Sequence, residues 1–190
     1  HLNLHGLIRS RELELGRDPD TGGQTQYVLE LVKNLANTSE VDQVDLVTRL
    51  IRDKRVSKDY SVEKEFIELG SRILRFQFGP EKYLRKELLW PYLDELVIKL
   101  SNFYEKPESK PDWIHAHYAD AGYVGVKLSK ILGVPLVFTS HSLGREKKRR
   151  LIETGLTPSK IEKIYCISKR IAAEEEALKE SSMIVTSTKQ

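Results

Sequence analysis

Two polar segments of this sequence have residue types that suit ligand binding, and each follows an apolar run and precedes a helical pattern. The first is Gly22-Gly23-Gln24, where two residues without side chains let a ligand approach the backbone closely. The helix expected to begin there would direct its unpaired N–H groups and the positive end of its dipole at the loop. Phosphates and closely spaced sugar hydroxyls suit such a site. The alternative is a plain turn before a helix.

The second segment, residues 141–145, combines an imidazole, a hydroxyl, a glycine and a cation. His141 can donate a hydrogen bond to a sugar hydroxyl or support charge in a transition state, or it can simply bind backbone groups of its own loop. Ser142 and Gly144 are typical of a turn that redirects the chain. Ser142 is not predicted to be a hydrolase nucleophile, because the Gly-x-Ser-x-Gly motif is absent.

Basic residues indicate a phosphate on the ligand. The run from Arg145 to Arg150 is interrupted only by Glu146, and a solvated helix face is its ordinary explanation. Lys147 is the member that we expect to reach back to a phosphate, because it closely follows the turn. Two further groups of cations lie elsewhere in the chain: Lys82, Arg85 and Lys86, and then Lys169 and Arg170. Together with the helix start, they exceed what a neutral ligand needs, and a phosphate monoester would use them.

A third polar segment contains His115 and His117, followed by Tyr118. Alternate residues of a strand face the same side, so both imidazoles are expected on one side of the sheet. No cysteine or carboxylate stands at a suitable spacing for zinc, so no metal site is predicted. Tyr118 can donate its hydroxyl to a ligand, or it can serve as a wall of the site.

Composition narrows the class of protein. The chain has 190 residues, enough for about one domain with a full core. A net charge of +3 is too small to indicate a nucleic-acid or membrane partner. The single cysteine, Cys166, excludes an internal disulfide and favours a reducing, cytoplasmic location. No signal peptide is recognised, and no apolar run approaches the roughly 18 residues that a membrane helix needs.

Apolar runs and helical periodicities alternate along the chain and define the elements that must position these residues. Strands are expected at residues 1–8, 44–51, 72–78, 112–117, 135–140 and 183–190. Helices are expected at residues 27–35, 89–103, 121–131 and 157–178, and a long polar loop covers residues 6–23. This order predicts an α/β fold with a Rossmann-like, doubly wound parallel sheet. Ligands bind such sheets at the carboxyl ends of the strands, where the polar segments lie.

Several segments, taken in order, resemble the sucrose-phosphate synthase family. They are residues 4–9, 14–18, 20–24, 86–90, 114–122, 141–145 and 170–175, and the resemblance covers essentially the whole chain. It implies the N-terminal lobe of a GT-B glycosyltransferase, which has two Rossmann-like lobes facing across a cleft. The reaction implied is transfer of glucose from UDP-glucose to fructose 6-phosphate with retention, giving sucrose 6-phosphate.

The resemblance also implies roles for individual residues. His141 would bind the transferred glucose and assist the reacting centre. The remaining site residues would contact the acceptor or its phosphate: Gly22, Gly23, Gln24, Lys86, Tyr118, Ser142, Lys147 and Arg170. Lys169 is included with them, although it stands where the family often has arginine, and a lysine lacks the bidentate fork of that side chain.

Residues 1–190 are accordingly expected to form one acceptor-binding lobe of a larger protein, with both ends cut. Its partners would be fructose 6-phosphate, UDP-glucose and a C-terminal lobe that binds most of the donor. The lobe would need no cofactor and would be inactive alone. Two alternatives stay open: a sucrose synthase, which accepts unphosphorylated fructose, and a non-catalytic module that binds a sugar phosphate.

Overall fold

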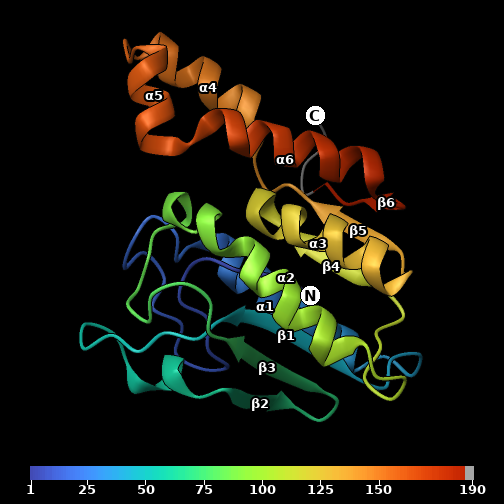
Figure 1. Cartoon of the computed structure of the whole chain (residues 1–190). Coiled ribbons are helices and arrows are strands. Elements are labelled where there is room, and N and C mark those ends of the chain that lie inside the picture. Colours follow the sequence, from blue (N-terminus) through green and yellow to red (C-terminus); the bar gives the residue numbers. More distant parts are fainter. Residues whose placement is uncertain (187–190) are drawn as a thin grey trace. The chain divides into compact units, whose positions relative to one another are not determined.

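The computed structural model describes residues 1–186 (Figure 1). The chain consists of two compact units. The first unit is His1–Lys99, and the second begins at Leu100, within helix α2 (Leu93–Tyr104). Each unit contains its own three-stranded sheet. That residues 1–190 act as a single lobe stays a prediction.

The sheet of the first unit has the order β1-β3-β2. Strand β1 (Val44–Arg49) pairs in parallel with β3 (Ser71–Phe76), and β2 (Lys64–Glu68) pairs antiparallel with β3. Helix α1 (Gly23–Ala36) buries its apolar face, at the helical spacing predicted from the sequence, against this sheet. The buried core between them contains Ile8, Val28, Leu29, Val32, Val44, Leu46 and Ile73.

The structure of this unit differs from the expected one in two ways. Residues 1–8 form no regular strand: Leu2 makes an isolated parallel bridge to Val47, and the left-handed Gly6 (φ 78°) then turns the chain into the loop. Strand β2 was not expected. Its side chains alternate between exposed and half-buried, so the strand lacks the apolar run of a fully covered strand. Because β2 is antiparallel, the sheet is mixed rather than wholly parallel.

The predicted helix over residues 89–103 begins later than expected. Three 3₁₀ turns occur in the first unit: η1 (Lys58–Ser61), η2 (Lys86–Leu88) and η3 (Trp90–Tyr92). The last two precede α2, and Pro91 lies in η3 rather than in the first turn of the α-helix. Proline has no N–H to donate, and the short turns accommodate it where the α-helical pattern would be interrupted.

The sheet of the second unit is wholly parallel and has the order β4-β5-β6. It consists of β4 (Ile114–His117), β5 (Leu136–Thr139) and β6 (Met183–Ile184). Helix α3 (Tyr118–Leu132) and helix α6 (Ile167–Glu180) pack side by side (Figure 1). Strands β4 and β5 are buried along their whole length, as expected for covered parallel strands. Of the predicted last strand, residues 187–190 lie outside the described residues.

Helix ends in this unit confirm some sequence signals and correct one. Gly133 ends α3 in the left-handed conformation (φ 66°), as its position predicted. The Thr157 hydroxyl caps α5 (Pro158–Tyr165), also as predicted. The single helix expected over residues 157–178 is wrong, because Cys166 takes a left-handed conformation (φ 46°) and separates α5 from α6. Arg170 therefore lies in the first turn of a new helix.

The basic run lies on a further helix, α4 (Gly144–Glu153). Over residues 1–186, none of the helices combines the length and the apolar character that crossing a bilayer requires.

Candidate functional site

The loop before α1 is held by polar contacts that are partly or fully buried. The Asp18 carboxylate accepts hydrogen bonds from the N–H groups of Asp20 (2.8 Å) and Thr21 (3.1 Å) and from the Tyr83 hydroxyl (2.8 Å). The Thr21 hydroxyl donates to the second Asp18 oxygen (3.0 Å) and accepts from the N–H of Leu7 (3.0 Å). These bonds join segments far apart in the sequence, so the loop has a defined conformation before any ligand binds.

The predicted glycine pair lies where α1 begins. Gly22 is extended and precedes the first helical residue, Gly23, and no side chain caps this helix end. A Cβ atom on either glycine would meet nothing within 4 Å, so the packing of the protein itself does not require them. The Gln24 amide donates to the Asn3 side chain (2.8 Å). The glycines thus leave space beside N–H groups at a helix start, which suits an oxygen-rich ligand.

Lys86 forms an ion pair in this unit. The side-chain ammonium of Lys86 contacts one carboxylate oxygen of Asp20, and the backbone N–H of Lys86 donates to the other oxygen (2.8 Å). Asp20 is only 6% exposed. Burial alone would raise the pKa of Asp20, but the hydrogen bond and charge of Lys86 hold that pKa below its usual value. Lys86 therefore compensates a buried carboxylate, and its contact with an acceptor stays a prediction.

The Asp20–Lys86 pair makes stability depend on pH. Because the folded pKa of Asp20 is depressed, the stabilisation is present above the unfolded pKa of about 3.9 and is lost as the pH falls through the folded value. Lys86→Met should cost about 3 kcal/mol at pH 7, where it leaves a buried charge unpaired, and less in acid. Urea unfolding at pH 7, 5 and 3 measures this difference, with the exposed Lys54→Met as control. A cost that does not change with pH would contradict the assignment.

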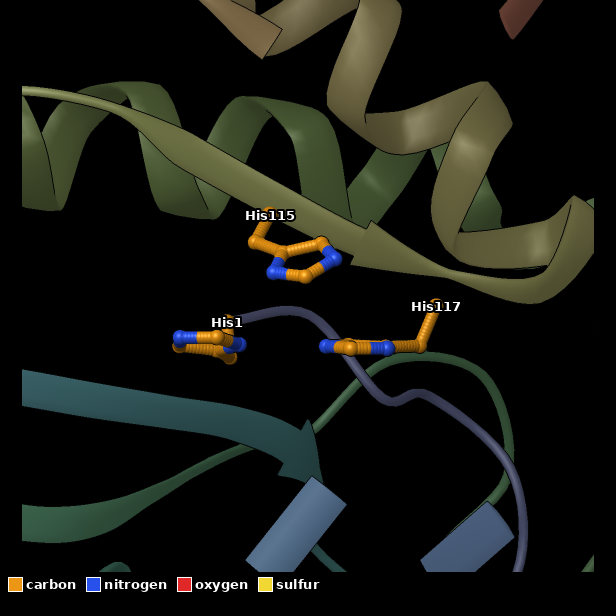
Figure 2. Close-up of side chains that lie close together, drawn as sticks. All are labelled: His1, His115 and His117. Atoms are coloured by element: carbon orange, nitrogen blue, oxygen red, sulfur yellow. The ribbon is translucent and has the colours of Figure 1, made fainter. Parts of the chain in front are cut away.

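The second unit places three histidines at the ends of neighbouring strands. His117 Nδ1 lies 3.1 Å from His141 Nε2, and His115 Nε2 lies 2.8 Å from the Thr139 hydroxyl. Figure 2 shows the His115 and His117 side chains of β4, whose rings stack with centroids 4.1 Å apart. His141 has a left-handed backbone (φ 57°) two residues after the end of β5, and Tyr118 has one (φ 77°) immediately after β4. His141 is thus fixed by a side-chain contact from the adjacent strand.

Burial keeps the two β4 histidines neutral. It lowers the pKa of His115 to about 3, with a smaller effect from the charge of His141. It lowers the pKa of His117 well below its usual value, and the neighbouring histidines add to the effect. At neutral pH each ring therefore carries one N–H proton, so that one ring nitrogen is a donor and the other is an acceptor.

Arg170 contacts two other predicted site residues of this unit, Ser142 and Tyr118. Its side chain is 4% exposed and donates to the Ser142 carbonyl (2.8 Å), to the Ser142 hydroxyl (2.9 Å) and to Glu174 (3.0 Å). The guanidinium carbon also lies 4.5 Å from the centroid of the Tyr118 ring. The second Glu174 oxygen accepts the N–H of Gly144 (2.6 Å). One buried ion pair thus connects α6 with the starts of α3 and α4.

Glu174 was missed by the sequence analysis. The available signal was its spacing of four residues from Arg170, which places both on one helix face. Burial raises the pKa of Glu174, and the charge of Arg170 and the N–H of Gly144 only partly oppose this. Gly144 is required by close packing, because a Cβ there would lie 2.9 Å from Glu174 Oε2 and from Ile171 Cγ1.

The two predicted lysines of this unit, Lys147 and Lys169, differ in their surroundings. The Lys147 ammonium lies 4.2 Å from the centroid of the Tyr165 ring, and Lys169 is exposed. In the basic run, three arginines pair with carboxylates: Arg145 with Glu175, and Arg149 and Arg150 with Glu146. The ordinary explanation of a solvated, ion-paired helix face is therefore confirmed for these arginines.

Comparison with known proteins identifies the family. The model of the family described as the sucrose synthase first GT-B domain matches residues 2–190. The chain belongs to this family. As a GT-B domain it has the fold class that the sequence resemblance implied, a mixed α/β, Rossmann-like lobe, although one edge strand is antiparallel.

Relatives of this GT-B domain carry the name of the family that the motifs resembled. It is 43% identical over 211 residues to "Sucrose-phosphate synthase 4" of Arabidopsis thaliana. This match covers 100% of this chain and 20% of that protein. It is 41% identical over 217 residues to "Sucrose-phosphate synthase" of Spinacia oleracea, again covering 100% of this chain and 20% of that protein. The chain thus spans about a fifth of the length of these curated relatives.

A solved structure supports the fold. The structure titled "Sucrose-phosphate synthase" from Thermosynechococcus elongatus superimposes with a TM-score of 0.73 at 23% identity. The match covers 96% of this chain and 41% of the other chain. At this level of identity the likeness concerns the fold alone.

Proposed function

We propose that this GT-B domain is the acceptor-binding lobe of a sucrose-phosphate synthase, a hexosyltransferase that moves glucose from UDP-glucose to fructose 6-phosphate. The product would be sucrose 6-phosphate. The names of the relatives support the proposal, as does the family to which the chain belongs. A donor-binding lobe of the same polypeptide, and a cytoplasmic location, belong to the proposal. The lobe alone is expected to be inactive.

The observation that carries the proposal is the convergence of Tyr118, Ser142 and Arg170 beside His141. Two hydroxyls and a guanidinium are the groups that proteins use to bind a sugar phosphate. The Arg170 guanidinium is held by Ser142 and Glu174, so it would meet a phosphate in a preset orientation. Lys147 and Lys169 would add positive charge, each as a point charge rather than a fork.

In the proposed reaction, the anomeric hydroxyl of fructose 6-phosphate attacks the anomeric carbon of glucose. The C–O bond to UDP breaks as the new glycosidic bond forms on the same face, through an oxocarbenium-like transition state, and the acceptor proton leaves toward the departing diphosphate. His141 would bind the glucose and stabilise charge at this centre. No metal or cofactor is part of this proposal.

The start of α1 would serve the anionic groups of the reaction. The N–H groups beside Gly22 and Gly23 suit oxygens that gain negative charge as a diphosphate leaves. Contact of Gly22, Gly23 and Gln24 with the acceptor, and of Lys86 with its phosphate, is carried over from the family resemblance. The ordered loop and the space beside both glycines support the first of these roles.

Lys147→Ala tests the phosphate assignment. In a polypeptide that joins this lobe to a donor-binding lobe, the change should raise KM for fructose 6-phosphate about 10- to 100-fold, because a charge-assisted contact is lost. KM for fructose should change little. Lys148→Ala, one residue along the same helix, is the matched control. If Lys147→Ala left the preference for fructose 6-phosphate intact, the phosphate assignment would be wrong.

Titration calorimetry separates the alternatives. The wild-type chain is titrated with fructose 6-phosphate, with fructose and with inorganic phosphate. Saturable binding that is tightest for fructose 6-phosphate supports the proposal. A preference for fructose would favour a sucrose synthase, the enzyme whose name the matching family carries. Tight binding without turnover in the two-lobed polypeptide would favour a non-catalytic module.

A further inference from the structure

We propose that His117 is a positioning residue for His141, holding the ring orientation and the tautomer of that histidine through its Nδ1 atom. The inference rests on the proposed function, in which His141 acts on the transferred sugar. His117 itself is completely buried, so it acts through its neighbour rather than on a ligand.

The backbone brings the two imidazoles together. His117 is the last residue of β4 and pairs with Thr139, the last residue of β5. His141 follows two positions later with a left-handed backbone, which directs its ring back toward β4. The resulting Nδ1–Nε2 distance of 3.1 Å and centroid distance of 5.3 Å describe a side-chain hydrogen bond between the rings.

The His117 ring is in turn held in place. It stacks on His115 at an interplanar angle of 29°, and His115 is fixed by its contact with the Thr139 hydroxyl. Two side chains from two adjacent strands, His115 and Thr139, thus hold the ring that carries His117 Nδ1. A ring held this firmly can impose its orientation on His141, whose segment has no regular secondary structure.

The charge state of His117 limits which hydrogen bonds it can make with His141. Burial keeps His117 neutral at ordinary pH, so its Nδ1 either donates one hydrogen bond to His141 Nε2 or accepts one from it. In both cases Nε2 of His141 is committed, and a sugar bound while this contact persists would meet the other ring nitrogen. Where a histidine binds a metal, loss of the partner that fixes its tautomer lowers metal affinity or activity about 10- to 100-fold. We expect an effect of similar size on turnover here.

The test compares three substitutions in the two-lobed polypeptide. His117→Phe keeps a ring of similar size but removes both nitrogens, and His117→Asn places an amide near the position of Nδ1. His115→Phe is the matched control, because it keeps the stacked ring and the His117–His141 contact but breaks the contact with Thr139. We expect His117→Phe to lower kcat about tenfold or more, with KM for both substrates within about twofold. His117→Asn should recover much of that loss, and His115→Phe should lose less.

A spectroscopic measurement separates positioning from packing. The ¹⁵N shifts of the His141 ring in the 190-residue chain report which nitrogen carries the proton. His117→Phe should change the tautomer populations of His141, and His115→Phe should change them clearly less. If His117→Phe folds and leaves both kcat and the His141 tautomer unchanged, the inference is overturned.

His141→Ala distinguishes this failure from failure of the proposed function. If His141→Ala retains wild-type turnover, the proposed role of His141 is wrong and the inference falls with it. If His141→Ala is impaired while the His117 variants behave as wild type, only the positioning role is wrong.

Discussion

Gly6→Ala destabilises the first unit far more than Gly16→Ala, although both glycines have almost the same left-handed backbone, with φ of 78° and 79°. A Cβ at Gly6 would lie 2.4 Å from the Asp20 carbonyl oxygen, whereas a Cβ at Gly16 would meet nothing within 4 Å. Gly16→Ala should therefore cost only the left-handed strain of about 1–2 kcal/mol. Gly6→Ala adds a clash with backbone that is held by the Asp18 network, and should cost about 4 kcal/mol or more.

Tryptophan fluorescence measures this difference for the first unit alone. Trp90 is buried there, and Trp113 is the other tryptophan of the chain. In a Trp113→Phe background, urea unfolding followed through Trp90 gives the free energy of unfolding for each glycine variant. Equal losses for Gly6→Ala and Gly16→Ala would show that Asp20 moves freely and that the loop is not held as described.

Arg170→Ala and Glu174→Ala each destabilise the second unit by about 3–5 kcal/mol, because each leaves a buried charge without its partner. Both side chains are 4% exposed, so water cannot replace the missing partner. Replacing both by apolar residues, Arg170→Met with Glu174→Leu, should cost clearly less than the sum of the single changes. Arg170→Ala should also weaken the binding of fructose 6-phosphate, since Ser142 loses both of its contacts with the guanidinium.

An exposed ion pair of the same helices provides the control. Arg145 and Glu175 also connect α4 with α6, but their side chains are 76% and 48% exposed. Arg145→Ala should cost less than about 1 kcal/mol. Hydrogen exchange of the β5 amides reports the stability of this unit for all variants. Similar costs for Arg145→Ala and Arg170→Ala would mean that burial does not decide the energy of the buried pair.

Local sequence patterns were sufficient to predict the strands and the helix end beside the candidate site. The apolar runs at β4 and β5 and the glycine after α3 depend on neighbouring residues alone, and the structure confirms them. Strand β2 was missed because an edge strand with alternating exposure has no apolar run. The interruption at Cys166 was missed because the helical spacing of isoleucines continues across it in the sequence.

The contacts within the site depend on distant parts of the chain. Tyr83 reaches Asp18 across 65 residues, and Arg170 reaches Ser142 across 28. Patterns along the sequence identified Ser142 and Arg170 as candidates, but not the partners that hold them. Glu174 was overlooked because an acidic residue in a helix of mixed charge looks like a solvated one until its burial is known.

The left-handed backbone of His141 has a consequence for how this position changes under selection. Glycine adopts that conformation without strain, and asparagine does so more readily than histidine. In mutant libraries screened only for thermal resistance, position 141 should therefore accept asparagine, which relieves the strain and keeps a side chain that can bond to His117. An imidazole there keeps the backbone strain, which the hydrogen bond to His117 opposes. Persistence of histidine at this position would thus record a requirement that folding alone does not impose.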